Sequence, residues 1–167
     1  ISERNTRERE IPALAAAGYR LWIPDQRGYN RSDKLARIAD YAVDRLAQDV
    51  VGLIDAAGRD RAVLIGHDWG AAVAWQVALR APGRLHALVI LNVPHPDVMR
   101  RHLRRSLDQL RRSAYIGFFQ LPWLPESILR RRNWAVMTGA MTSSSLPDTF
   151  TSAELDRYRE AWSRPGA

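Results

Sequence analysis

The side chain best suited to chemistry in this sequence is the carboxylate of Asp68, which lies in the run Gly66-His67-Asp68-Trp69-Gly70-Ala71. A short apolar run at 62–65 precedes it, and a helical pattern at 71–79 follows it. A strand, a sharp turn and a helix in this order are typical of a nucleophile elbow, where the nucleophile stands at the tip of a strained turn. An aspartate at that tip favours attack at an sp³ carbon, which gives an alkyl ester of the protein.

Small residues around Asp68 support this interpretation of the turn. The close approach of strand and helix leaves room only for small residues two positions before the nucleophile and two or three after it. Those positions hold Gly66, Gly70 and Ala71. The alternative is a structural turn carboxylate, since aspartate favours turns in general. The small residues on both sides favour the nucleophile.

The elements that must position this turn alternate between strand and helix patterns. Strands are expected at 19–23, 62–65 and 88–91, and helices at 11–17, 43–57 and 71–79. Gly18 and Gly58 stand where the first two helices should end. The continuous apolar run at 88–91 is typical of a strand covered on both faces. The alternation predicts a parallel α/β sheet flanked by helices, whereas the pattern after residue 94 is helical and irregular.

The composition is ordinary for a globular protein, with 46% hydrophobic residues in 167. No apolar stretch has the length of a membrane span, and the N-terminus has no signal-peptide pattern. The chain has no Cys, so disulfides and thiol chemistry are not expected. No two histidines share a spacing suited to a metal. We expect a cytoplasmic protein without membrane contact, metal or cofactor, whose oligomeric state stays open.

The net charge of +7 comes almost wholly from arginine, because Lys34 is the only lysine. The arginines cluster at 100–105, 111–112 and 130–132. Such clusters are typical of a nucleic-acid or anionic surface, or of the solvated face of a helix. Apolar residues at positions 99, 103, 107 and 110 have amphipathic helical spacing, and no nucleic-acid motif accompanies the charge. The solvated face is preferred, and no nucleic-acid partner is expected.

Several separated motifs between residues 11 and 167 resemble those of the epoxide hydrolase family of α/β-hydrolases, and the turn at Asp68 is the most specific of them. The loop Asp25-Gln26-Arg27-Gly28-Tyr29-Asn30-Arg31-Ser32-Asp33 resembles the family's D-x-R-G-Y-G-x-S-D loop. Asn30 replaces a glycine there, which is a mild change because asparagine tolerates a left-handed backbone. Segment 92–96 resembles the place where the family's chain leaves the sheet for the cap domain. Segment 113–122 resembles the cap segment with the first of two tyrosines that act as acids, and segment 163–167 resembles the stretch just before the second.

The resemblance implies a partial α/β-hydrolase core at 1–93, with its elbow at 66–71, and a largely helical cap at 94–167. In such enzymes Asp68 would attack an epoxide carbon, and Tyr115 would be one of two cap acids for the ring oxygen. The backbone N–H of Trp69 would form half of the oxyanion hole. A phenol suits the acid role because it stays protonated at neutral pH. The partners implied are a small epoxide and water.

Other parts of the family's pattern are not found in this sequence. The H-G-x-P loop and the strand before it should precede residue 11 in the chain. In the family's sheet, that strand normally lies between the strands expected here at 19–23 and 62–65. The second tyrosine, the catalytic acid and the catalytic histidine should follow Ala167. None of His67, His86, His95 and His102 follows the cap, so none has the place of the base. We therefore expect an internal fragment of a longer enzyme, inactive alone.

Three other functions stay open. Haloalkane dehalogenases also have an Asp-Trp-Gly elbow, but they hold the halide with N–H donors and need no phenol. The segment around Tyr115 and the run Pro94-His95-Pro96 favour the epoxide, and Asn92 is an amide where some dehalogenases carry an acid. The remaining possibilities are an arginine-rich module that binds anionic surfaces and a catalytically silent fragment.

Overall fold

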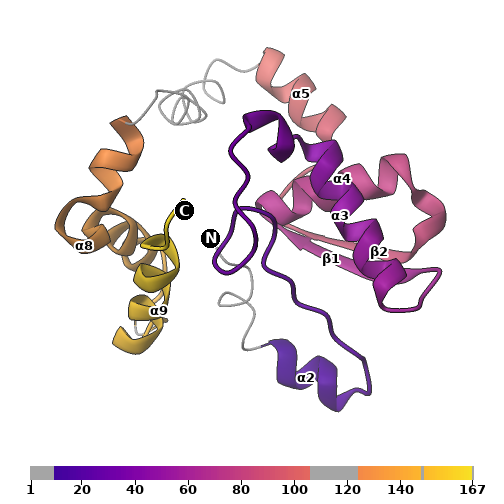
Figure 1. The fold of residues 1–167 in the computed structure, drawn as a ribbon, viewed down its shortest axis with the longest axis horizontal. Coiled ribbons are helices and arrows are strands. Elements are labelled where there is room, and N and C mark those ends of the chain that lie inside the picture. Colours follow the sequence, from indigo (N-terminus) through magenta and orange to yellow (C-terminus); the bar gives the residue numbers. More distant parts are fainter. Residues whose placement is uncertain (1–9, 106–123, 148, 167) are drawn as a thin grey trace.

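A computed structural model describes residues 10–105, 124–147 and 149–166. An α/β unit occupies 43–91, and two further helices, α8 and α9, lie nearer the C-terminus (Figure 1). The α/β unit consists of α3 (Val43–Ala56), β1 (Ala62–His67), α4 (Trp69–Arg80), the short 3-10 helix η2 (Pro82–Arg84) and β2 (Leu85–Leu91). The strands are parallel, with His67 opposite Leu91 at their carboxyl ends. The predicted parallel α/β sheet flanked by helices is confirmed for these residues.

The core of the α/β unit surrounds α4. This helix packs against both strands and also against α3. Val73 and Val77 of α4 are almost completely buried and form a cluster with Ala47 of α3. Leu64 and Leu85, one from each strand, pack against that cluster. Burial of these side chains holds the start of α4 at a fixed place beyond the end of β1.

The opposite face of the sheet is open in the part of the chain that the structure describes. The pairing is irregular between Ala62 and Val63, and beyond it Val89 and Leu91 pair with residues of β1 that alternate with Leu64. Because Leu64 packs toward α4, Val63, Val89 and Leu91 point to the opposite face. Their exposed fractions are 50%, 41% and 36%. The predicted strand at 88–91 is confirmed, but only one of its faces is covered by described residues.

The prediction of a strand at 19–23 is wrong. Residues 19–26 have no strand pairing, and β1 and β2 form the whole sheet within the described residues. Backbone N–H and C=O groups form a strand only where a neighbouring strand can pair with them. No described strand lies along this segment, so its extended pattern alone does not make it part of the sheet.

The helices before and after this segment follow their sequence signals. α2 spans Glu10–Ala16, and Gly18 follows it with φ of +87°. The N–H of Gly18 donates to the carbonyl of Ala15, and the N–H of Tyr19 donates to that of Leu14. This pair of bonds is the Schellman motif, which a glycine in the left-handed region allows. α3 ends in the same way before Gly58, whose φ is +67°.

The later part of the chain is helical and irregular where the structure describes it, as predicted. α5 spans Pro96–Arg105, α8 spans Leu124–Ser143 and α9 spans Ser152–Trp162. α8 is broken at 131–134, where Arg132, Asn133 and Trp134 have positive φ. Figure 1 shows α8 and α9 close together, on the other side of the molecule from α3 and α4. No described helix is long and apolar enough to cross a membrane.

Candidate active site

Asp68 stands alone between the last residue of β1 and the first residue of α4. Its φ is +50° and its ψ is −125°, a backbone conformation that residues other than glycine rarely adopt. Its carbonyl oxygen accepts the N–H groups of Ala71 at 2.9 Å and Ala72 at 3.2 Å, which starts the helix. Its side chain makes no capping bond and is exposed. The strained turn expected from the sequence is present, and the carboxylate is not used to cap the helix.

Gly66 explains why the turn needs small residues. A Cβ at this position would lie 2.7 Å from Cα of Ala71, 2.7 Å from the carbonyl oxygen of Gly70 and 2.8 Å from Cβ of Ala74. Two of these neighbours are backbone atoms, which cannot move aside cheaply. Gly70 and Ala71 are themselves buried at the start of α4. The three small residues therefore let β1 and α4 meet closely enough to form the turn.

Trp69 is the first residue of α4. The first N–H groups of a helix have no acceptor within that helix, so the N–H of Trp69 is available to an oxyanion next to Asp68. The indole itself is 68% exposed. Tyr115, the predicted acid, and the whole segment 113–122 lie outside the described residues, so the structure does not place the phenol relative to Asp68.

The loop at 25–33 is folded onto itself by hydrogen bonds. The hydroxyl of Ser32 donates to the carbonyl of Asp25 at 2.6 Å, and the amide of Asn30 donates to the Asp25 carboxylate at 2.9 Å. The φ of Asn30 is +44°, so the expected left-handed backbone at this asparagine is confirmed. Gly28 has φ of +88° and leaves space for the ring of Tyr41. A Cβ on residue 28 would lie 2.7 Å from that ring.

Arg27 attaches this loop to α3. Its Nε and one Nη donate to the two carboxylate oxygens of Asp49 at 2.9 and 2.6 Å, and its other Nη donates to the carbonyl of Asp40 at 3.1 Å. Hydrogen bonding and charge attraction to Asp49 raise the pKa of Arg27 above its ordinary value. A planar fork meeting a carboxylate through two bonds fixes direction as well as distance, so the loop has a defined orientation on α3.

The segment after β2 contacts the elbow at His67 and α4 at Trp75. The amide of Asn92, whose φ is +64°, lies 3.3 Å from Nε2 of His67. The indole N–H of Trp75 donates to the carbonyl of Val93 at 3.3 Å, and its ring meets that of His95 edge to face at 4.8 Å between centroids. Trp75 has no sequence signal for such a contact, because an aromatic residue in an apolar helix indicates only core packing.

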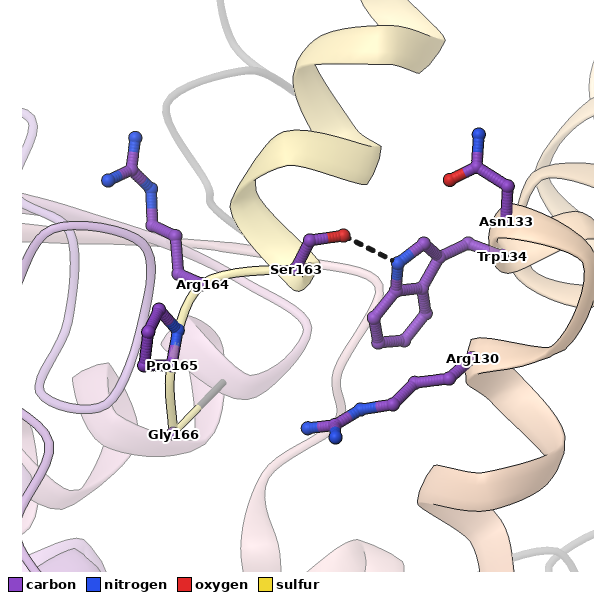
Figure 2. Close-up of a pocket in the computed structure, with 7 residues that line it drawn as sticks. All are labelled: Arg130, Asn133, Trp134, Ser163, Arg164, Pro165 and Gly166. Atoms are coloured by element: carbon purple, nitrogen blue, oxygen red, sulfur yellow. Dashed lines mark hydrogen bonds between the residues drawn. The ribbon is translucent and has the colours of Figure 1, made fainter.

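A cavity of about 420 Å³ lies away from these predicted residues. Figure 2 shows it between the break in α8 and the end of α9, lined by Arg130, Asn133, Trp134, Ser163, Arg164, Pro165 and Gly166. The indole N–H of Trp134 donates to the hydroxyl of Ser163 across it at 2.8 Å. None of its lining residues belongs to the predicted site. No cluster of three His, Asp or Glu residues suited to a metal occurs among the described residues.

The sharp turn at Asp68, with a parallel strand before it and a helix after it, defines the chain as an α/β-hydrolase. The family model described as alpha/beta hydrolase fold matches residues 4–133. That match covers most of the chain, and the chain belongs to this family.

Its relatives include proteins named epoxide hydrolases. The chain is 45% identical over 158 residues to the AB hydrolase superfamily protein YfhM of Bacillus subtilis, which covers 95% of this chain and 55% of the relative. It is 35% identical over 154 residues to human Epoxide hydrolase 4, which covers 89% of this chain and 42% of the relative. The chain thus spans about half the length of the curated relatives it matches.

The solved structures most similar to this fold include epoxide hydrolases as well. One from metagenomes of hot environments superposes with a TM-score of 0.80 at 30% sequence identity. The match covers 96% of this chain and 53% of that structure. The recognition of an epoxide hydrolase-like α/β-hydrolase from the sequence is therefore confirmed at the level of family and fold.

Proposed function

We propose that this chain is the nucleophile-bearing part of an epoxide hydrolase and that Asp68 forms an ester with an epoxide carbon. The observation that carries the proposal is the positive φ of Asp68 at the junction of β1 and α4, with a side chain that makes no capping bond. A strained conformation at a residue that the helix does not need for capping favours a functional role. The similarity to proteins named epoxide hydrolases supports the choice of substrate class.

The proposed first step is displacement at carbon. A carboxylate oxygen of Asp68 forms a bond to an epoxide carbon, and the bond between that carbon and the ring oxygen breaks. The ring oxygen leaves as an alkoxide and takes a proton from a phenol, for which Tyr115 is the proposed donor. The products of this step are a hydroxyalkyl ester of Asp68 and a phenolate, which regains its proton from water.

The proposed second step is hydrolysis of that ester. Water adds to the ester carbonyl, and the N–H of Trp69 donates to the oxygen that becomes negative. Collapse of the tetrahedral intermediate releases the diol and restores the Asp68 carboxylate. The base for this step is not one of the four histidines of this chain, since none of them follows the proposed cap segment in chain order. The substrates are a small epoxide and water.

The division into a core at 1–93 and a cap at 94–167 belongs to the same proposal. The change from strands and helices to helices alone after β2 supports it within the described residues. The cap would carry Tyr115 over the sheet end that carries Asp68. A cytoplasmic location stays a prediction from the sequence.

The test is a single turnover in water enriched in ¹⁸O, using the full gene product that contains these residues and styrene oxide. The ester mechanism predicts that the first diol takes its new oxygen from Asp68 and that the Asp68 peptide gains ¹⁸O from the solvent. Asp68→Ala should abolish both the ester and turnover, whereas Asp60→Ala, at an exposed carboxylate before β1, should keep both.

Two outcomes would contradict the proposal. One is a first diol that already contains ¹⁸O, which would mean direct attack by water. The other is undiminished turnover in Asp68→Ala. Halide release from a haloalkane, with no diol from styrene oxide, would instead assign the ester chemistry to dehalogenation.

A further inference from the structure

The segment from Asn92 to His95 contacts the end of β1 before Asp68 and helix α4 after it. Asn92 contacts His67, the residue directly before the proposed nucleophile. Val93 and His95 contact Trp75, which follows that nucleophile on α4. The parallel register that places His67 opposite Leu91 brings the segment to this position. The exit from the sheet is therefore attached directly to the strand and helix that hold Asp68.

Trp75 lies within α4, the helix that begins directly after Asp68. The two residues are seven positions apart, which is about two helical turns and about 10 Å along the axis. The indole is partly buried, and it makes both a directional hydrogen bond to Val93 and an edge-to-face contact with His95. A single side chain therefore links the helix of the nucleophile to two residues of the exit segment.

His95 in turn directly precedes the next helix, α5, and accepts hydrogen bonds from its first turn. Its carbonyl oxygen accepts the N–H groups of Val98 at 2.9 Å and Met99 at 3.0 Å, and its ring Nδ1 accepts the N–H of Asp97 at 3.2 Å. These are bonds of a helix N-terminus, so His95 sets where α5 starts and in which direction it leaves. Any change in the placement of His95 moves α5 with it.

We propose that Trp75 is a positioning residue that fixes the start of α5 relative to Asp68 through its contacts with Val93 and His95. The inference rests on the proposed function in one respect, since α5 is taken as the first helix of the cap. Trp75 touches no reacting atom. It acts by holding the cap's first residues at one place beside the elbow, so that a cap acid meets the epoxide oxygen while Asp68 meets the carbon.

The expected effect is on the reaction geometry rather than on binding. A displacement of about 1 Å between reacting groups can reduce a rate by about 100-fold, even when the change lies far from the chemistry. A purely structural role for Trp75 would lower the amount of folded protein and leave each folded molecule fully active. The two roles therefore differ in the rate per active site.

The first experiment is amide hydrogen exchange of the peptide covering 92–99 in the full gene product. Trp75→Phe keeps a ring near His95 and loses the N–H that Val93 accepts, so we expect about fivefold faster exchange. Trp75→Leu loses both contacts, and exchange should be more than about tenfold faster. Trp22→Phe is the matched control, since Trp22 is 44% exposed in the segment before the 25–33 loop.

The second experiment measures turnover of styrene oxide, with active sites counted from the ester that accumulates on Asp68. We expect Trp75→Leu to lower kcat per active site about tenfold, with KM within about twofold of the parent. Trp75→Phe should recover part of the loss, and Trp22→Phe should match the parent. The proposal would be overturned if the lower rate of Trp75→Leu were fully explained by a smaller number of active sites. It would also be overturned if the rate of amide hydrogen exchange at 92–99 were the same in Trp75→Leu as in the parent.

The two proposals fail in different ways. If the parent neither hydrolyses epoxides nor forms an ester, the proposed function is wrong, and the exchange experiment still decides whether Trp75 holds the exit segment. If Asp68 forms the ester but Trp75→Leu exchanges and turns over like the parent, only the role of Trp75 is wrong.

Discussion

Asp68 has a backbone conformation that disfavours the folded state and a side chain that does not relieve the strain. A non-glycine residue with φ of +50° and ψ of −125° costs on the order of 1–3 kcal/mol. Burial of Val73 and Val77 in the same helix offsets that cost, because the helix cannot move away from the strands without exposing them. The strain at one residue is therefore held by the packing of the helix that follows it.

Gly66→Ala tests this close packing at the level of a single methyl group. The added Cβ would lie 2.7–2.8 Å from three atoms, two of them backbone atoms, so the strand and the helix must separate. We expect a loss of about 3 kcal/mol of unfolding free energy, at the upper end for overpacking, measured by urea denaturation.

Gly52→Ala is the matched control for that substitution. Gly52 lies inside α3, and nothing stands within 4 Å of the position of its Cβ. Alanine is the better helix former by about 0.5–1 kcal/mol, so this variant should be slightly more stable than the parent. Equal stabilities for the two variants would show that the elbow does not need a glycine at position 66.

At the scale of elements, the predictions from sequence succeed where the signal is local. The left-handed glycines Gly18 and Gly58 end α2 and α3, as their positions predict. The glycine and alanine pattern at 66–71 predicts the sharp turn because the constraint arises within one strand, one turn and one helix. The capping box of Thr151 and Glu154, which begins α9, is a local signal of the same kind.

The predictions fail where an element depends on a distant neighbour. The aromatic and aliphatic residues at 19–23 predict a strand, but pairing needs a second strand, and none of the described strands pairs with them. The contact of Trp75 with Val93 joins positions 18 apart in the chain, so no local pattern reports it. Half of the candidate site, the turn at Asp68, could thus be predicted from sequence, while its attachment to the exit segment could not.

At the scale of the whole molecule, several arginines among the described residues form ion pairs with carboxylates nearby in the chain. Arg100 pairs with Asp97 at 3.0 Å, Arg159 with Asp156 at 2.7 Å, and Arg164 with Glu160 at 2.7 Å, each three or four residues apart. Such exposed pairs are typical of a solvated helix face.

These pairs lead us to predict weak binding to nucleic acids. Titration of labelled duplex DNA at physiological salt should give dissociation constants of about 10⁻⁶ M or weaker, and these constants should rise steeply as salt is added. Nanomolar binding that survives a rise in salt would instead favour an arginine-rich binding module.

The last prediction concerns a polypeptide of these 167 residues alone, which should not turn over epoxides. Its four histidines all lie at or before position 102, so none follows the proposed cap segment to activate water against the ester. A lost oxyanion donor, such as the one expected before residue 11, costs about 100- to 1000-fold in rate. Asp68 is exposed at its turn and can still react, so we expect at most one ester per chain.

Exposed apolar surface should also limit the solubility of this polypeptide. Val63, Val89 and Leu91 form a patch on the sheet face away from α4, and such patches favour association. The measurement is incubation of the purified polypeptide with styrene oxide, followed by intact mass and quantitation of the diol. One added epoxide mass per chain, absent in Asp68→Ala, is the expected result. Diol that accumulates in proportion to the polypeptide and is lost in Asp68→Ala would mean that a base for ester hydrolysis is present among these residues.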